Sequence, residues 1–297
     1  MSASGTSTTP SPTTTTPSRQ GVVTSEIDVD EWLRQGEARN DAVAISVVVP
    51  AYNEELRLPH ALIEMIDVLD SRSATYEIIV VDDGSSDGTS ATVRQFERIR
   101  PQVRLVRLPV NRGKGHAVRT GVLNAKGARV LFADADGATP FGEISRLERA
   151  LDGGADVAIG SRAMVSQDTR VKTVLHRRLL GRVFNAWVNA MLLPNVADTQ
   201  CGFKLFTRSA AQFLFSRQQS ERFSFDVELL YIARRARLDV REVPVNWTNV
   251  PGSKVNLVVD ASRMLRDVVV FRWRHREVMQ SHYSAHRAAT VHDFAGA

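Results

Sequence analysis

Residues 78–89 read Ile-Ile-Val-Val-Asp-Asp-Gly-Ser-Ser-Asp-Gly-Thr, an apolar run that ends in acidic and glycine-rich residues. Four branched apolar side chains in a row are typical of a strand that is buried on both faces of a parallel sheet. Similar short runs occur at 45–50, 103–108, 130–133 and 157–159. The segments between the first four runs carry apolar residues at helical spacing, as in 56–69. This alternation predicts an α/β fold whose mostly parallel, Rossmann-like sheet is flanked by helices.

The composition is that of an ordinary globular protein. The chain has 297 residues, of which 43% are hydrophobic and 24% charged, and this excludes collagen-like, mucin-like and wholly disordered proteins. The net charge of +5 suits an anionic partner such as a nucleotide, a nucleic acid or a membrane surface, without choosing among them. A single cysteine, Cys201, excludes an intrachain disulfide framework. No apolar run approaches the roughly 20 residues that span a bilayer, so we expect no transmembrane helix.

The sequence divides into three parts. Residues 1–40 form a tail and lead-in whose first twenty residues are nearly all Ser, Thr and Pro, a composition that predicts disorder. Residues 41–277 hold the alternating strands and helices and are expected to form one domain that ends in an amphipathic helix. Residues 278–297 lack hydrophobic periodicity, and we expect a loose C-terminal tail there.

Acidic residues follow the predicted strand at 130–133. Asp134 and Asp136 are separated by one alanine, and residues two apart in an extended segment point the same way. Hard carboxylate oxygens of this kind favour Mg²⁺ or Mn²⁺ held jointly with substrate phosphates. An Asp-x-Asp sequence also occurs in ordinary solvated turns, but its place at a strand end favours a metal site at Asp134 and Asp136.

The loops after the first two strands are candidates for nucleotide binding, because ligands of open α/β sheets bind at the carboxyl ends of the strands. Asp83 has a carboxylate that suits the imide N–H of a uracil, Tyr52 offers a ring for stacking, and Glu54 suits a ribose. A capped turn would explain Asp87 and Thr89 equally well, but it leaves the adjacent Asp82 and Asp83 without a role.

The segment Arg112-Gly113-Lys114-Gly115 precedes a predicted helix at 116–124. Glycines allow a backbone to approach a phosphate closely, and a helix N-terminus beside a lysine favours anions. The spacing matches neither the P-loop nor the dinucleotide-binding fingerprint. A glycine-containing turn with exposed cations is the alternative interpretation.

Two basic amphipathic segments occur later in the chain. Between Arg170 and Ala197 no acidic residue occurs, and basic residues alternate with Leu, Phe and Trp. In the second segment, Met264, Val268 and Phe271 share one helical stripe with Leu265, and arginines lie around it. Such helices suit the surface of an anionic membrane, although a helix packed on the core with a solvated basic side shows the same pattern. No nucleic-acid-binding module is recognisable.

In their order along the chain, the motifs resemble those of the family 2 glycosyltransferases of the GT-A fold. The similarity is greatest to the branch that glycosylates polyprenyl phosphates, including the dolichyl-phosphate β-glucosyltransferases and their bacterial relatives. It extends from about residue 45 to 274 and rests on eight blocks: VVVPAYNEE, IIVVDDGSSDGT, NRGKGHAVRTG, LFADADGAT, IGSR, DTQCGFKLF, FSFDVELLYIARR and NWTNVPGSKV. Eight blocks in order are far more specific than any one of them.

The resemblance implies an inverting, metal-dependent transfer of glucose from UDP-glucose to a polyprenyl phosphate, dolichyl or undecaprenyl, with Mg²⁺ or Mn²⁺ as cofactor. The residues implied to bind uridine are Pro50, Tyr52, Glu54 and Asp83. Lys114 is expected near the diphosphate, with Asp134 and Asp136 on the metal. The acceptor phosphate is assigned to Arg162, Arg170 and Lys172. Asp198 corresponds to a carboxylate beside the reacting centre, and Asp226 either binds sugar hydroxyls or supports the site.

The eukaryotic members of this branch carry an N-terminal transmembrane helix, whereas this sequence begins with its Ser/Thr/Pro tail. We therefore expect a bacterial-type enzyme, peripheral on the cytoplasmic face of the cell membrane. A GDP-mannose-dependent polyprenyl-phosphate mannosyltransferase and a non-catalytic nucleotide- and membrane-binding module are the alternatives. The residues leave the oligomeric state open. A dehydrogenase is disfavoured because residues 50–54, Pro-Ala-Tyr-Asn-Glu, replace a glycine-rich turn after the first strand.

Overall fold

The computed structural model describes Met1 and residues 43–164, 166–172, 175–250 and 257–295. In this part of the chain, the main sheet has seven strands in the order β3-β2-β1-β4-β7-β5-β8. Their bounds are β1 (Ile45–Ala51), β2 (Tyr76–Asp82), β3 (Val103–Arg107), β4 (Arg129–Ala133), β5 (Val157–Ser161), β7 (Phe203–Thr207) and β8 (Val240–Pro244). All neighbours pair in parallel except β7, which runs antiparallel between β4 and β5. The predicted mostly parallel α/β sheet is confirmed.

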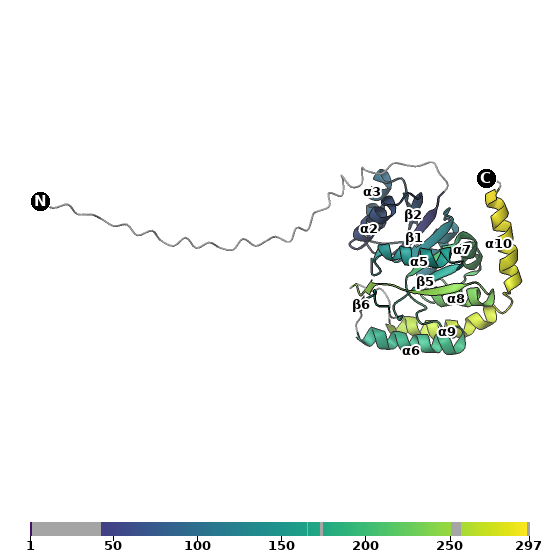
Figure 1. Ribbon diagram of the computed structural model, residues 1–297. Coiled ribbons are helices and arrows are strands. Elements are labelled where there is room, and N and C mark those ends of the chain that lie inside the picture. The colour runs from purple at the N-terminus through teal and green to yellow at the C-terminus, as the bar shows by residue number, and fades with distance from the viewer. Residues whose placement is uncertain (2–42, 165, 173–174, 251–256, 296–297) are drawn as a thin grey trace.

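Helices cover both faces of the sheet (Figure 1). One face packs against α2 (Leu58–Asp70), α3 (Thr89–Ile99), the 3-10 turn η1 (Phe141–Glu143) and α5 (Ile144–Asp152). The other face packs against α4 (Lys114–Leu123), α6 (Leu175–Met191), α7 (Arg208–Arg217), α8 (Phe225–Arg235), α9 (Leu257–Arg274) and α10 (Gln280–Ala295). The alternation of side chains along β1 explains the division, because Val47 and Val49 belong to the first core and Val48 to the second.

Strand β7 is a difference from the sequence-based expectation, because residues 198–207 are not among the five runs predicted as strands. Only the first part of that segment is a turn, and β7 begins at Phe203. The buried Lys204 interrupts the apolar pattern of this strand, so hydrophobicity alone does not reveal it. The register of β7 on β4 brings the backbone N–H of Asp134 to the carbonyl of Gly202 at 3.0 Å.

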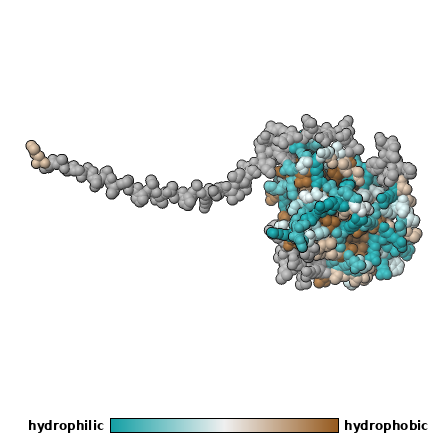
Figure 2. Space-filling view, viewed as in Figure 1, coloured by the Kyte–Doolittle hydropathy of each residue, from teal (hydrophilic) through white to brown (hydrophobic). Residues whose placement is uncertain are grey.

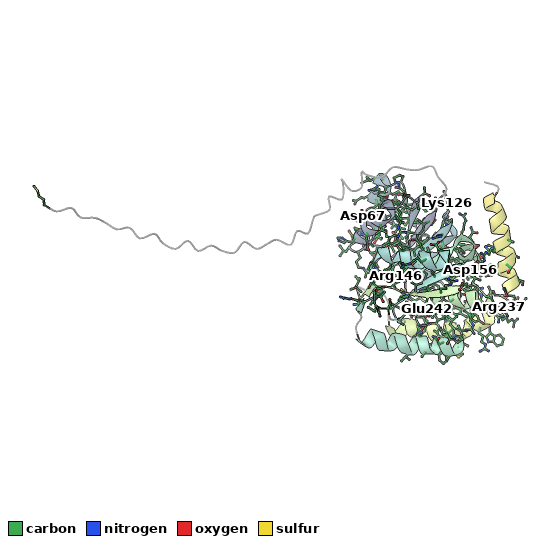
Figure 3. All side chains as sticks on the ribbon, viewed as in Figure 1. Asp67, Lys126, Arg146, Asp156, Arg237 and Glu242 are labelled. Carbon is green, nitrogen blue, oxygen red and sulfur yellow. The ribbon has the colours of Figure 1, made fainter. Side chains whose placement is uncertain are left out.

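The expectation of a loose tail from residue 278 is wrong for the described residues, because α10 occupies 280–295. Tyr283 anchors this helix: it is 5% exposed, its hydroxyl donates to Asp156 at 2.6 Å, and its ring meets Phe213 of α7 edge-on. Figure 3 shows Asp156 on the side of the domain that α10 covers. The helix was missed because its buried contacts come from isolated residues rather than a continuous stripe. The predicted disordered tail, residues 1–40, lies outside the described residues.

Helices α6 and α9 lie side by side along one edge of the domain (Figure 1). In α9, Met264, Val268 and Phe271 are buried in the core, so most of the apolar stripe predicted for a membrane packs inward. A second stripe on α9 is exposed, as described below. Within the described residues, we find no helix with the length and apolar character that crossing a bilayer requires.

Candidate active site

The strand order places the predicted functional loops together. Because β3, β2, β1 and β4 are adjacent and parallel, their carboxyl ends lie along one edge of the sheet. The acidic and glycine-rich loops after these strands therefore border one crevice, as the sequence predicts. Segments that follow β5 and precede β7 reach the same region, where they bring Arg162 and Asp198 close to the end of β4.

The pair Asp134 and Asp136 follows β4 directly. Asp134 Oδ1 lies 2.6 Å from Lys114 Nζ, and Asp136 Oδ2 lies 3.9 Å from Arg57 Nη1. Burial and the neighbouring charge of Asp134 raise the pKa of Asp136 above its ordinary value. Two carboxylates that repel each other in a partly buried place form a donor set that suits a hard divalent cation. In the described part of the chain no third His, Cys, Asp or Glu completes a metal-binding cluster, so other ligands would have to come from substrate or water.

Gly202 makes room for the Asp134 carboxylate. A Cβ atom added at this position would lie 2.0 Å from Oδ2 and 2.2 Å from Cγ of Asp134. No other side chain fits at this point of the chain without moving the carboxylate. The close approach of Gly202 to the Asp134 carboxylate follows from the antiparallel pairing of β7 with β4 and was not anticipated from the sequence.

A chain of alternating charges extends from Lys114 into the protein. Burial alone would lower the pKa of Lys114, but the carboxylates of Asp134 and Asp226 outweigh it, and the pKa is raised. Asp226 accepts a hydrogen bond of 2.5 Å from Lys204 Nζ, which also donates to the carbonyl of Cys201 at 2.6 Å. Lys204 and Asp226 are both buried. Of the two roles expected for Asp226, this ion pair favours support of the site over contact with a sugar.

Asp198 and Arg162 form a bidentate ion pair. Arg162 donates from Nε to Oδ2 at 2.7 Å and from Nη2 to Oδ1 at 2.9 Å, and its backbone N–H also donates to Oδ2 at 2.9 Å. Burial acts to raise the pKa of Asp198, but Arg162 reverses this and holds the pKa below its ordinary value. Glu242 of β8 fixes the loop by accepting the backbone N–H groups of Ala197 and Asp198 at 2.7 and 2.9 Å. A carboxylate that is ionised and accepts hydrogen bonds on both oxygens orients other groups and is a poor proton acceptor.

The two adjacent aspartates after β2 have separate structural roles. Asp82 accepts the backbone N–H of Ser85 at 2.8 Å and the hydroxyl of Ser90, and it thereby closes the turn before α3. Asp83 accepts the backbone N–H groups of Arg112 and Gly113 at 3.0 and 2.7 Å, so it fixes the loop in front of α4. Each oxygen of Asp83 keeps a further lone pair for a ligand.

The loop after β1 carries the remaining predicted nucleotide contacts. Pro50 is buried near the end of β1, and Tyr52 is 37% exposed beside it. Glu54 is nearly buried and binds Arg57 through two hydrogen bonds of 2.7 and 2.5 Å. Arg57 therefore lies between Glu54 and Asp136, and it is a second residue of the crevice that the motifs did not reveal.

The residues predicted to attract an acceptor phosphate are only partly brought together. Arg162 lies in the crevice, and its guanidinium carbon is 5.5 Å from the ring centre of Trp247 in β9 (Trp247–Thr248). Arg170 is exposed, and its backbone N–H donates to Asn246 at 2.8 Å just before β6 (Val171–Lys172), which pairs with β9. The side chain of Lys172 lies outside the described residues.

The seven-stranded sheet flanked by helices is the GT-A fold of glycosyltransferases. Residues 46–215 match the family model described as Glycosyl transferase family 2. The chain therefore belongs to glycosyl transferase family 2 and is a glycosyltransferase. The resemblance inferred from the order of the motifs is thus confirmed.

Proteins of known function in this family are similar over most of the chain. The dolichyl-phosphate beta-glucosyltransferase of Drosophila melanogaster is 44% identical over 242 residues, which cover 76% of this chain and 74% of the relative. The human protein of that name is 41% identical over 244 residues, covering 78% and 75%. Among solved structures, glucosyl-3-phosphoglycerate synthase from Mycobacterium tuberculosis in complex with Mn²⁺ and UDP-glucose superposes with a TM-score of 0.57. The two sequences are 21% identical, and the matched part covers 78% of this chain and 79% of the synthase, so this comparison shows that the two proteins share a fold.

Proposed function

We propose that the protein transfers glucose from UDP-glucose to the phosphate of a polyprenyl lipid and inverts the anomeric configuration. The observation that carries this proposal is the crevice in which Lys114, Asp134 and Asp136 face the ion pair of Arg162 and Asp198. The relatives named above support glucose as the sugar and dolichyl phosphate, or a similar polyprenyl phosphate, as the acceptor.

The donor would lie along the ends of β1, β2 and β4. Tyr52 would stack on the uracil, Asp83 would accept its imide N–H through a remaining lone pair, and Glu54 would bind the ribose. Pro50 shapes the loop below the base. Lys114, at the first turn of α4, would attract the diphosphate, because a lysine beside a helix N-terminus favours anions.

A divalent ion, Mg²⁺ or Mn²⁺, would be held by Asp134 and Asp136 together with the donor diphosphate. When bound, it supplies positive charge opposite the departing diphosphate. The raised pKa of Asp136 and the 3.9 Å length of its contact with Arg57 support this assignment. A protein of similar fold, the synthase named above, has been crystallised with Mn²⁺ and UDP-glucose, and this is consistent with the assignment of the metal.

In the transfer step, an oxygen of the lipid phosphate attacks C1 of glucose from the face opposite UDP. The new bond joins C1 to this oxygen, the bond from C1 to the UDP oxygen breaks, and its electron pair leaves with UDP. The attacking phosphate is already an anion at neutral pH, so no strong base is needed. Arg162 donates hydrogen bonds from Nε and from one Nη2 proton to Asp198, and its remaining N–H groups would hold the acceptor phosphate. Arg170 and Lys172 would attract the same phosphate, and Asp198 keeps Arg162 in place.

The acceptor is a membrane lipid, so we place the protein peripherally on an anionic membrane, at the cytoplasmic face, with α6 and α9 towards the lipid. Exposed apolar side chains on these two helices support this orientation. Val183 of α6 is 63% exposed, and Trp273 of α9 is 72% exposed.

The test is a reaction of the purified full chain with Mg²⁺ or Mn²⁺ and either UDP-glucose or GDP-mannose, with and without a polyprenyl phosphate. Release of UDP that requires both metal and lipid, with glucose found on the lipid, is the expected result. Turnover with GDP-mannose alone would instead identify a mannosyltransferase. Nucleotide binding without turnover, under any of these conditions, would refute the proposed reaction.

A further inference from the structure

A second cavity lies between the segment 219–224 and helix α9, with a volume of about 280 Å³. Residues from both segments line it, and they include none of the residues assigned to the donor, the metal or the acceptor above. The segment 219–224 contacts the first turn of α4, where the backbone carbonyl of Glu221 accepts the backbone N–H of His116 at 3.0 Å. It also contacts the loop before α4, where the Glu221 side chain pairs with Arg112. The cavity is therefore a separate site that borders the proposed donor-phosphate loop from behind.

Arginines dominate the charge of this cavity. Four of them line it, Arg222, Arg263, Arg266 and Arg274, against two acids. Both acids are engaged: Glu221 pairs with Arg112, and Asp267 accepts the Ser224 hydroxyl at 2.6 Å. Arg222 and Arg263 are exposed and form no ion pair with any carboxylate in the described part of the chain. Uncommitted guanidinium groups that converge on one cavity suit a phosphate, which accepts paired hydrogen bonds.

A buried glutamate fixes the walls of the cavity. Glu228 of α8 has no exposed surface, and it accepts the backbone N–H groups of Gln219 and Ser220 at 3.1 and 2.7 Å. The same side chain bonds His275, at the end of α9, at 2.7 Å. Both walls are thus tied to one carboxylate, and Arg274 is held 3.9 Å from it. A site that is formed before its ligand arrives loses less free energy in ordering its residues.

An exposed apolar stripe lies on the same helix. Leu265, Val269 and Trp273 are 40%, 45% and 72% exposed, and their spacing of four residues places them on one side of α9. Two arginines that line the cavity lie close to Leu265 along the chain: Arg266 follows it directly, and Arg263 precedes it by two residues. A ligand with a phosphate and a hydrocarbon chain would satisfy both features at once, as a membrane lipid does.

We propose that this arginine cavity is a lipid-phosphate site: it binds the phosphate of a membrane lipid while Leu265, Val269 and Trp273 enter the hydrocarbon. The lipid is either an anionic phospholipid of the bilayer or a polyprenyl phosphate that binds here before its phosphate reaches Arg162, since both present the same group. The proposal extends the membrane orientation given above and does not depend on the transfer reaction.

The test compares two double variants of the full chain with equal loss of charge. In R222Q/R263Q the cavity loses its two uncommitted arginines, whereas R272Q/R276Q removes two exposed arginines near the end of α9 that do not line the cavity. Co-sedimentation with vesicles of phosphatidylcholine, with and without phosphatidylglycerol, measures binding. We expect the cavity variant to bind anionic vesicles about tenfold more weakly or worse, because it loses hydrogen bonds to the phosphate as well as charge. We expect the control, which loses charge alone, to lose distinctly less.

A second arm determines which lipid supplies the phosphate. The KM for polyprenyl phosphate is measured in neutral detergent. A raised KM in the cavity variant identifies the polyprenyl acceptor as the lipid in the cavity. An unchanged KM with weakened vesicle binding identifies a bulk phospholipid instead. Equal loss of vesicle binding in both double variants would show a diffuse charge effect and overturn the proposal. The proposal would also be overturned if the cavity variant showed neither weaker vesicle binding nor a raised KM. Because vesicle binding is measured without turnover, an inactive protein still tests this site. Thermal melting confirms that both variants fold.

Discussion

Replacement of Gly202 by alanine tests whether the position of the Asp134 carboxylate governs catalysis. The added Cβ would lie 2.0 Å from Oδ2 of Asp134, whereas non-bonded carbon and oxygen atoms need roughly 3.5 Å. The carboxylate must therefore move by at least about 1 Å, and a misplacement of that size costs about 100-fold in rate. We expect kcat/KM to fall by about this factor, or about 2.7 kcal/mol in transition-state stabilisation.

The assay follows UDP release and lipid-linked glucose, with Mn²⁺ binding in the presence of UDP as a second readout. Gly142→Ala is the matched control, because nothing lies within 4 Å of a Cβ added there. Neither glycine has a positive φ, so alanine imposes no backbone strain at either position. Activity of the Gly202 variant within about threefold of the control, with unchanged Mn²⁺ affinity, would refute the assigned role of Asp134.

Three further variants address the other charged groups. Asp136→Ala should leave the unfolding temperature nearly unchanged and abolish transfer, and retained metal-dependent turnover would contradict the site. Lys204→Met leaves Asp226 buried without its closest cation and should lower the free energy of unfolding by about 3 kcal/mol. Urea denaturation measures this free energy of unfolding, and adding Asp226→Asn to Lys204→Met should restore part of the loss. A double variant less stable than Lys204→Met would argue against the Lys204–Asp226 ion pair. Asp198→Asn should destabilise by about 2 kcal/mol at neutral pH through its weakened bonds to Arg162. Because the folded pKa of Asp198 is lowered, its contribution is present above the unfolded pKa and lost as pH falls through the folded pKa. The difference from wild type should vanish in acid, and a gap independent of pH would exclude this origin.

Most of the sheet and the position of the crevice could be predicted from the sequence, because the first five strands are short runs rich in branched apolar residues, and the first four have distinctive loops after them. Strand β7 could not be predicted in this way, since Lys204, its second residue, is compensated by Asp226, which is 22 residues away in sequence. The helix α10 depends on Tyr283 reaching Asp156, a contact across 127 residues. Contacts at such separations have no periodic signal that a single sequence reveals.

For the site, residue types indicated the chemistry but not the partners. Asp83 was expected to contact a base, and the structure adds a second role, the fixing of the loop before α4. Arg57 and Glu242 were missed because an isolated charged residue on a helix or strand has no motif around it. Gly202 lies in one of the eight blocks on which the resemblance rests. The position of the Asp134 carboxylate explains why a glycine fits there, and only the packing of β7 on β4 reveals this.

The pairing of carboxylates with cations in the crevice bears on where a divalent ion would bind. Carboxylates expected to serve the reaction mostly have a cation within 2.7 Å, as in Lys114–Asp134, Arg57–Glu54 and Arg162–Asp198. Asp136 differs, because its contact with Arg57 is 3.9 Å long and burial raises its pKa. A partly buried carboxylate with a distant cation is costly unless another positive group approaches it. The donor diphosphate is itself an anion, so it would add to this repulsion. A divalent ion bound with the diphosphate would supply positive charge to both Asp136 and the diphosphate, which is why we place the metal at Asp136 together with its neighbour Asp134.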